Sequence, residues 1–157
     1  MKNNLANYTV EELKNIARTI KLRGFSKLKK QDLMDKIEEA ILDKEFATEF
    51  FKGLYEEEFE IFTNAIKEDV EFEDYMPLVV EEYGYAYVTD KGVVKIDEKV
   101  KNLFNEIQTK EFKEERAKQQ LILSYCDAAI NLYGICSDEK IIEIIINFIR
   151  LFILFKV

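Results

Sequence analysis

The sequence predicts a mostly α-helical protein with one small β-hairpin. One proline and five glycines occur in 157 residues, so few residues interrupt helices. Apolar residues recur through most of the chain at the i, i+3, i+4, i+7 spacing of a helix that buries one face. Only the stretch 85–96 has the composition of β-strands, as two runs around the glycine-containing loop 89–92. An apolar share of 48% is enough to bury a core.

Two helices are predicted at the N-terminus. Thr9 and Glu12 have the spacing of a capping box, so the first helix follows Thr9 and is expected to end near Lys21. An extended link leads to a second helix from about Lys29 to Leu42. The two apolar stripes consist of Leu13, Ile16, Ala17 and Ile20 in the first helix and of Leu33, Met34, Ile37 and Ile41 in the second.

The rest of the chain is also predicted to be helical outside the hairpin. Asp97, Thr109 and Ser137 are expected to cap helices. The predicted helices span 46–53, 55–68, 73–83 with Pro77 in its first turn, 98–107, 111–132, and 138 to near the C-terminus. This order predicts three parts: a basic helix-loop-helix over 1–42, an acidic domain over 43–109, and a C-terminal helical pair over 110–157.

Charge is distributed unevenly along the chain. The whole sequence has a net charge of −8, which disfavours nonspecific binding to a polyanion. Residues 1–42 nevertheless have a net charge of +3, whereas residues 43–157 have −11. The stretch 14–30 contains seven Lys and Arg residues and no acid.

These cations form the candidate nucleic-acid-binding surface. Three of them share one face of the first helix because they stand at i, i+4 and i+7. Three others open the second helix, where free backbone N–H groups suit a phosphate although the helix dipole disfavours cations. The seven candidates are Lys14, Arg18, Lys21, Arg23, Lys27, Lys29 and Lys30. The alternative is a solvated basic face with nothing bound to it.

Residues 8–42 resemble the SAP domain and its relative, the small N-terminal helical domain of transcription termination factor Rho. The shared pattern is a helix with spaced apolar residues, then the link Gly24-Phe25-Ser26 with lysines after it, then a second apolar stripe at Leu33, Ile37 and Ile41. The resemblance implies binding to DNA or RNA. So small a module makes few phosphate contacts, so the binding is expected to be weak and sensitive to salt.

The middle of the chain resembles a winged helix in topology only, with three helices followed by a hairpin over 45–96. Its third helix would have to read the DNA groove, yet it contains four acids and no base: Glu73, Asp74, Glu81 and Glu82. This favours a contact with an unknown protein partner. The rival interpretation of the whole chain is an acidic interaction or inhibitor module that mimics nucleic acid and binds none itself. Pairing of the 14–30 cations with the 43–74 acids would favour that rival.

No catalytic site, metal site or cofactor is predicted. The chain has no His, and Cys126 and Cys136 are too few for a zinc site or a disulfide framework. The carboxylate runs near Glu57 and Glu68 have no partner to order them, so the chain is not expected to be an enzyme. With no signal peptide recognised at the N-terminus, a reducing cytoplasmic location is expected.

The C-terminal stretch 141–157 is apolar at 13 of its 17 positions. Glu143, Asn147 and Arg150 interrupt it, so it is a poor membrane span, and no membrane contact is expected. Its apolar residues point to every side of a helix, more than one neighbouring helix can cover. A homo-oligomer is therefore expected, with Ile149 and Phe152 in the interface.

Overall fold

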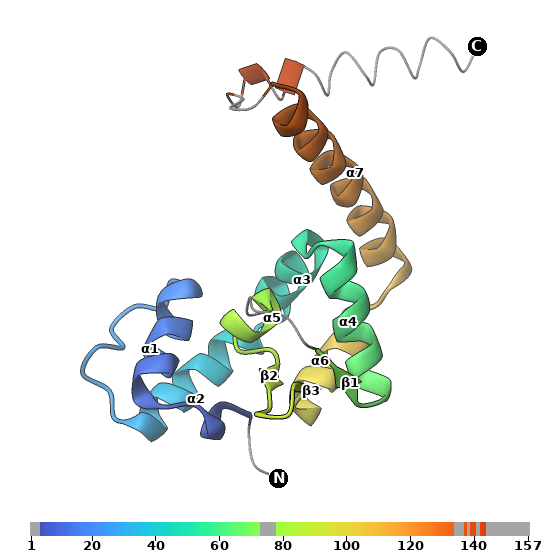
Figure 1. Cartoon of the computed structure of the whole chain (residues 1–157). Coiled ribbons are helices and arrows are strands. Elements are labelled where there is room, and N and C mark those ends of the chain that lie inside the picture. The colour runs from blue at the N-terminus through green and yellow to red at the C-terminus, as the bar shows by residue number, and fades with distance from the viewer. Residues whose placement is uncertain (1–3, 73–77, 134–136, 138, 141, 144–157) are drawn as a thin grey trace.

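The computed structural model describes residues 4–72, 78–133, 137, 139, 140, 142 and 143, and it confirms a mostly helical chain with a small antiparallel sheet (Figure 1). The elements in chain order are the 3-10 helix η1 (Asn4–Asn7), α1 (Val10–Thr19), α2 (Lys30–Ile41), α3 (Lys44–Gly53), α4 (Glu56–Lys67), β1 (Val70–Glu71), α5 (Val79–Glu82), β2 (Tyr87–Val88), β3 (Val93–Lys95), α6 (Glu98–Ile107) and α7 (Lys110–Tyr133).

Side-chain caps fix where several helices begin. The Asp97 carboxylate accepts a hydrogen bond from the Lys99 N–H at 2.9 Å, and the Thr109 hydroxyl accepts one from the Phe112 N–H at 3.1 Å. Both caps were predicted, and α6 and α7 begin directly after them. Asp43 caps α3 in the same way, so this helix begins at Lys44, two residues before the predicted start.

The predicted hairpin is part of a three-stranded sheet with the order β1-β3-β2. The loop 89–92 joins β2 to β3 as expected, but the strands are shorter than predicted, and β1 was not predicted at all. Val94 of β3 pairs with Val70 on one side and Val88 on the other. Gly92 has a φ of +74°, and a Cβ there would lie 3.0 Å from the Phe72 carbonyl oxygen, so only glycine fits this turn.

Among the described residues, a cluster of buried side chains runs from Leu5 to Phe112. Its centre is aromatic: Phe51 lies 4.8 Å from Phe62 and 4.9 Å from Phe104, measured between ring centroids. The apolar stripes of α1 and α2 belong to the same cluster. The predicted N-terminal unit therefore packs directly onto the elements that follow it.

The long helix α7 is attached to this body through Arg116, a residue that is only 5% exposed. Its guanidinium donates to the carbonyl oxygens of Phe51 at 3.0 Å and Leu54 at 2.6 Å, and to the Glu56 carboxylate at 2.8 Å. It also lies 3.8 Å from the centre of the Phe59 ring. Arg116 thus satisfies carbonyls at the C-terminal end of α3 that the helix leaves unpaired.

Two predicted helices differ from the structure or lie outside the residues that it describes. The helix predicted over 73–83 appears only as the short α5, Val79–Glu82, and residues 73–77, including Pro77, lie outside the description. The Ser137 hydroxyl accepts from the Lys140 N–H at 3.4 Å, as the predicted cap requires. Most of the last helix, with Ile149 and Phe152, lies outside the described residues. The winged-helix resemblance stays a prediction.

Candidate nucleic-acid interface

The first helix of the basic unit begins with the predicted capping box. The Glu12 N–H donates to the Thr9 hydroxyl at 3.3 Å, and the Thr9 N–H donates to the Glu12 carboxylate at 2.6 Å. These bonds satisfy two backbone N–H groups that the helix itself leaves without a partner. The two hydrogen bonds lower the pKa of the Glu12 carboxyl below its ordinary value.

The helix α1 ends in a tight left-handed turn at Lys21. The Leu22 N–H donates to the Ala17 carbonyl at 2.8 Å, and the Lys21 N–H donates to the Arg18 carbonyl at 3.0 Å. This pair of bonds closes a helix when the residue after the C-cap takes a positive φ. Lys21 has a φ of +55°, the only positive φ at a non-glycine position among the described residues. Glycine ordinarily occupies this position in a helix, whereas here a lysine occupies it.

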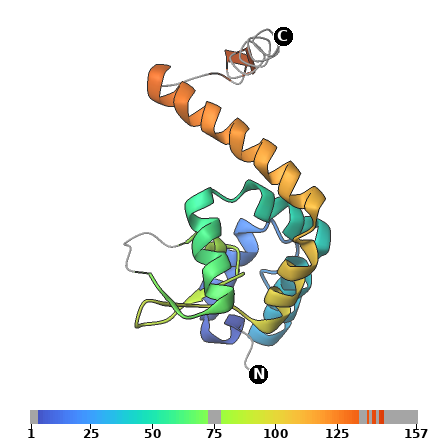
Figure 2. The same cartoon turned by 90° about the vertical axis from the view of Figure 1, so that its right-hand side faces the viewer.

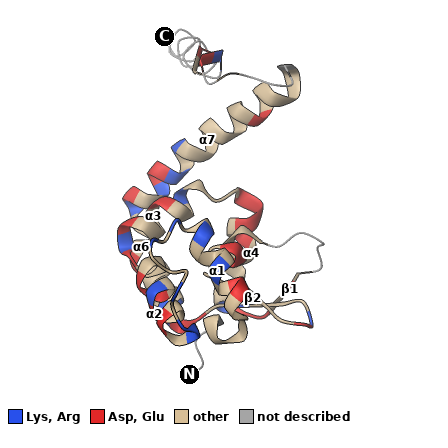
Figure 3. Ribbon diagram, turned by 90° about the vertical axis from the view of Figure 1, so that its left-hand side faces the viewer, with Lys and Arg blue, Asp and Glu red and all other residues tan. Residues whose placement is uncertain are grey.

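All seven predicted cations belong to the N-terminal unit and most of them are exposed; we call this set of residues the basic surface. All seven lie on α1, on the link after it, or at the start of α2, and Figure 3 shows basic residues on α1 while acidic residues gather on α4. Lys14 is half-buried. The other six side chains are exposed: Arg18, Lys21, Arg23, Lys27, Lys29 and Lys30.

The start of α2 is poorly built for helix stability. Lys29 occupies the N-cap with no side-chain hydrogen bond to the helix, and Lys30 is the first helical residue. Cations are unfavourable at this end of the helix dipole, and Lys is a poor N-cap. Lys30 donates to the Ala6 carbonyl at 3.2 Å, which holds it against η1.

One further lysine positions the link between the two helices. Lys36 of α2 donates to the carbonyl oxygen of Arg23 at 2.9 Å. Gly24, the next residue, has a φ of +72° and stands close to the Lys36 ammonium. The sequence analysis did not single out Lys36, because its partner lies 13 residues away and no periodic pattern relates the two.

Most cations of the basic surface are not neutralised by the acidic middle of the chain. Among the described residues, the ion pairs of the 43–74 acids reach Lys52, Lys95 and Arg116, and none reaches a cation of 14–30. Arg18 has an acidic partner, Glu11, at 3.2 Å on its own helix, and this pair is exposed. The outcome that would favour the nucleic-acid mimic is therefore not observed.

An acidic groove of about 400 Å³ lies on another flank of α1. It is lined by Glu12, Asn15 and Thr19 of that helix, with Glu81 and Glu82 beyond them. Burial raises the pKa of the Glu81 carboxyl above its ordinary value, and its oxygen accepts from the Val88 N–H at 3.2 Å.

Two further sequence expectations concern metals and membranes. In the described part of the chain, no cluster of three or more Cys, Asp or Glu side chains is arranged to hold a metal ion. None of the helices in that part is long and apolar enough to cross a bilayer.

Comparison with known families finds a match to the segment that contains the basic surface. Residues 4–45 match the family model described as Rho termination factor, N-terminal domain. Comparison with curated proteins and with solved structures finds no match. The similarity to the SAP domain stays a prediction. The unit that carries the basic surface, from η1 to the start of α3, is thus similar to the N-terminal domain of Rho termination factor.

Proposed function

We propose that this chain is a non-catalytic nucleic-acid-binding protein whose basic surface contacts the phosphate backbone. The observation that carries the proposal is the group of seven cations within 14–30, of which six are exposed and none is paired with the described acids of the middle of the chain. The family match of the same segment supports it. The proposal includes a location in the reducing cytoplasm.

The chemistry of the surface favours phosphate contacts over base recognition. Six of its seven side chains are lysine or arginine groups that reach into solvent, and such groups bind phosphates with little dependence on sequence. Binding should therefore weaken steeply as salt rises, since each neutralised phosphate releases counterions. The net charge of −8 keeps the overall affinity low.

The test replaces Lys27, Lys29 and Lys30 together by alanine. Affinity for a duplex or single-stranded oligonucleotide should fall, and on B-DNA the slope of log affinity against log salt should flatten by about 0.9 for each phosphate that the protein no longer neutralises. Stability should change little, because exposed substitutions usually stay within about 0.5 kcal/mol each. Fluorescence anisotropy at several salt concentrations measures both the affinity and the slope.

A matched variant controls for the change in total charge. Lys91, Lys113 and Lys118 are also exposed lysines, and they lie on the hairpin loop and on α7. Their replacement by alanine removes the same charge away from the basic surface. The assignment is wrong if both triple variants bind equally well or if neither changes the salt slope.

We further propose that the acidic remainder contacts a protein partner with a basic surface. Glu57 in the first turn of α4 is exposed, and the acidic groove beside α1 adds the exposed Glu82. The partner itself is unidentified. The rival function, an inhibitor that imitates nucleic acid, would leave binding to oligonucleotides undetectable even at low salt, so the same titration separates the two.

We also propose self-association through the segment 141–157. The support is its composition, because 13 apolar residues of 17 exceed what one packed helix face can hide.

A further inference from the structure

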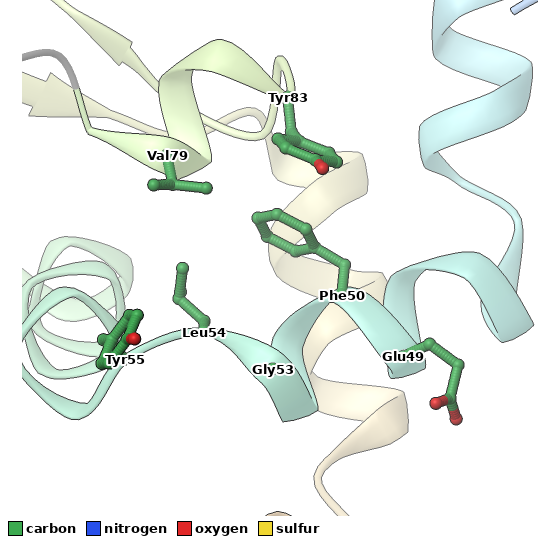
Figure 4. A pocket seen from close by; sticks show the side chains of 7 residues that line it. All are labelled: Glu49, Phe50, Gly53, Leu54, Tyr55, Val79 and Tyr83. Carbon is green, nitrogen blue, oxygen red and sulfur yellow. The ribbon is translucent and has the colours of Figure 1, made fainter. Parts of the chain in front are cut away.

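A pocket of about 320 Å³ lies between α5 and the turn that joins α3 to α4. Aromatic side chains form much of its lining. The ring centroids of Phe50 and Tyr83 are 4.6 Å apart, and Figure 4 shows these two rings together on one side of the pocket, with Tyr55 on the other. Leu54 and Val79 complete the apolar part of the lining. The proposed nucleic-acid interface does not use this pocket.

Tyr55 is the most accessible aromatic side chain of this lining. It is 53% exposed, whereas Phe50 and Tyr83 are half-buried. The Tyr55 hydroxyl donates to the Asp127 carboxylate at 3.4 Å. Asp127 belongs to the half of α7 that extends away from the body, as Figure 2 shows. An aromatic ring that is hydrogen-bonded in place and open to solvent offers a partner a preformed contact surface.

The accessible charge around the pocket is negative. Glu49 belongs to the lining, and no Lys or Arg of the described residues does. Glu49 pairs with Lys52 at 2.8 Å, but Lys52 also pairs with Glu115, so one ammonium group is shared by two carboxylates. The Lys52 side chain is only 13% exposed, whereas that of Glu49 is 66% exposed. Asp127 takes part in no ion pair within the described part of the chain. A cation is therefore the complementary ligand.

The same turn already holds one arginine from within the chain. The Arg116 guanidinium lies 3.8 Å from the centre of the Phe59 ring and pairs with the Glu56 carboxylate at 2.8 Å. An aromatic face and a carboxylate together bind the planar guanidinium group there. The pocket offers the same combination, with Tyr55 as the ring and Asp127 as the acid, and no arginine of the described residues lines it.

We infer that this pocket receives an arginine side chain of the basic protein partner. The methylene stem of the arginine packs on Leu54 and Val79, and its guanidinium stacks on the Tyr55 ring beside the carboxylates. The inference rests on the proposed contact between the acidic part of this chain and a basic partner. It gives that contact a defined place in the fold and a defined side chain.

Arginine matches the pocket better than the other side chains a partner could insert. A wholly apolar side chain would leave the carboxylates of Glu49 and Asp127 without a new counter-charge. Lysine brings the charge but has no planar group to stack on an aromatic ring. Arginine combines an apolar stem with a flat cation, which corresponds to an apolar and aromatic lining with acids at its edge.

The test measures binding of a fluorescein-labelled pentaarginine peptide to the full-length protein at low salt, by fluorescence anisotropy. Tyr55→Ser removes the exposed ring without changing the charge. The peptide affinity should fall about two- to fivefold, as expected for a cation–π contact at a partly exposed site. Leu121→Ser is the matched control, because Leu121 is 54% exposed and lies outside the pocket lining. This control should leave the affinity unchanged.

A second pair of variants compares equal changes in charge. Val79→Lys places an ammonium group at the pocket, where it competes with the peptide, and Val10→Lys adds the same charge elsewhere. Val79 and Val10 are 39% and 38% exposed, and each is the first residue of its helix. Val79→Lys should weaken peptide binding by a larger factor than Val10→Lys. This pair decides the question if Tyr55→Ser lowers the helix content measured by circular dichroism.

Two further peptides test the chemistry of the occupant. Pentacitrulline has nearly the shape of pentaarginine but no charge, and pentalysine has the charge without the planar group. Both should bind more weakly than pentaarginine, and Tyr55→Ser should change their affinities less. Equal binding of pentacitrulline would assign the pocket to an uncharged side chain and overturn the inference. Equal binding of pentalysine with the same loss in Tyr55→Ser would overturn the choice of arginine.

NMR locates the bound peptide. Adding pentaarginine should shift the backbone amide signals of Gly53, Leu54 and Val79 most strongly. If pentaarginine binds but neither Tyr55→Ser nor Val79→Lys weakens it more than its control, the pocket assignment is wrong and the proposed acidic contact stands. If pentaarginine does not bind even at low salt, both the pocket assignment and the acidic contact are wrong.

Discussion

Lys21 has a backbone conformation that costs an L-residue about 1–2 kcal/mol and costs glycine nothing. Replacing it by glycine should raise the free energy of unfolding, by about 0.5–1 kcal/mol after the greater chain entropy of glycine is counted. The same change removes a cation of the basic surface, so oligonucleotide affinity should fall. Urea denaturation and a salt titration on one sample measure the two opposite effects.

Lys14→Gly separates the turn from the change in charge. Lys14 lies inside α1 and belongs to the same cationic face, so glycine there should lower stability by about 1 kcal/mol and also weaken binding. If Lys21→Gly destabilises the protein as Lys14→Gly does, the left-handed turn is wrongly placed. If it stabilises without weakening binding, Lys21 does not belong to the interface.

Arg116 should be the costliest single side chain to remove from α7. Arg116→Ala removes the donor to the Phe51 carbonyl and leaves the Leu54 carbonyl with only the Gln120 side chain as donor, and we expect the free energy of unfolding to fall by an amount on the order of 3 kcal/mol. Glu56→Gln, which removes only the charge of its partner, should cost less than about 1 kcal/mol because Glu56 is largely exposed. Similar decreases in the two variants by urea denaturation would mean that the ion pair, and not the carbonyl contacts, attaches α7.

At the scale of one element, the capping box couples α1 to pH. The folded protein lowers the pKa of Glu12, so this carboxylate stabilises the fold above its unfolded pKa. This stabilisation is lost as the pH falls through the pKa that Glu12 has in the folded protein. We expect the Glu12 pKa, followed by NMR, to rise toward its ordinary value in Thr9→Ala. An unchanged Glu12 pKa would contradict the cap.

Element boundaries could be predicted where their causes are local. Thr9, Asp97 and Thr109 begin helices through bonds to residues two or three positions away, which the sequence displays directly. The strand β1 could not be predicted, because two residues show no periodicity and their partners, Val93 and Val94, lie more than 20 positions later. For the same reason nothing in the sequence marked Arg116, whose acceptors lie about 60 residues earlier.

The candidate site also combines features with local causes, which could be predicted, and features that depend on distant residues, which could not. The presence of seven cations and their positions on two helices and the link between them could be predicted from the sequence alone. The left-handed turn at Lys21 and the contact from Lys36 to the Arg23 carbonyl could not, because both depend on how the link folds back over α2. The acidic flank of α1 also depends on packing, since Glu81 and Glu82 come from α5.

For the whole molecule, we expect concentration-dependent self-association at micromolar concentration. Each large apolar side chain that moves from water into an interface contributes roughly 1.5–3 kcal/mol. Ile149→Asp or Phe152→Asp should therefore shift the sedimentation profile toward the monomer. These two positions lie outside the described residues, so the expectation rests on the sequence. A well-folded monomer that ignores both substitutions would show that the segment is covered within its own chain.

The hydroxyl of Tyr8 donates to the carbonyl of Ala86 at 2.9 Å, across 78 residues of sequence. With Ile37 and Ile41 in the same buried cluster as Phe104, the basic unit shares its interior with the remainder of the chain. The N-terminal unit should therefore not fold well on its own. If the chain were cut after residue 42, the unit would expose its apolar face to water, and the rest of the chain would expose the matching face. Transplanting it to another protein would require bringing α3 and the sheet along to cover that face. An oligonucleotide bound at Lys27 should accordingly slow hydrogen exchange at Ala86 as well as in α2, because opening either one opens the other.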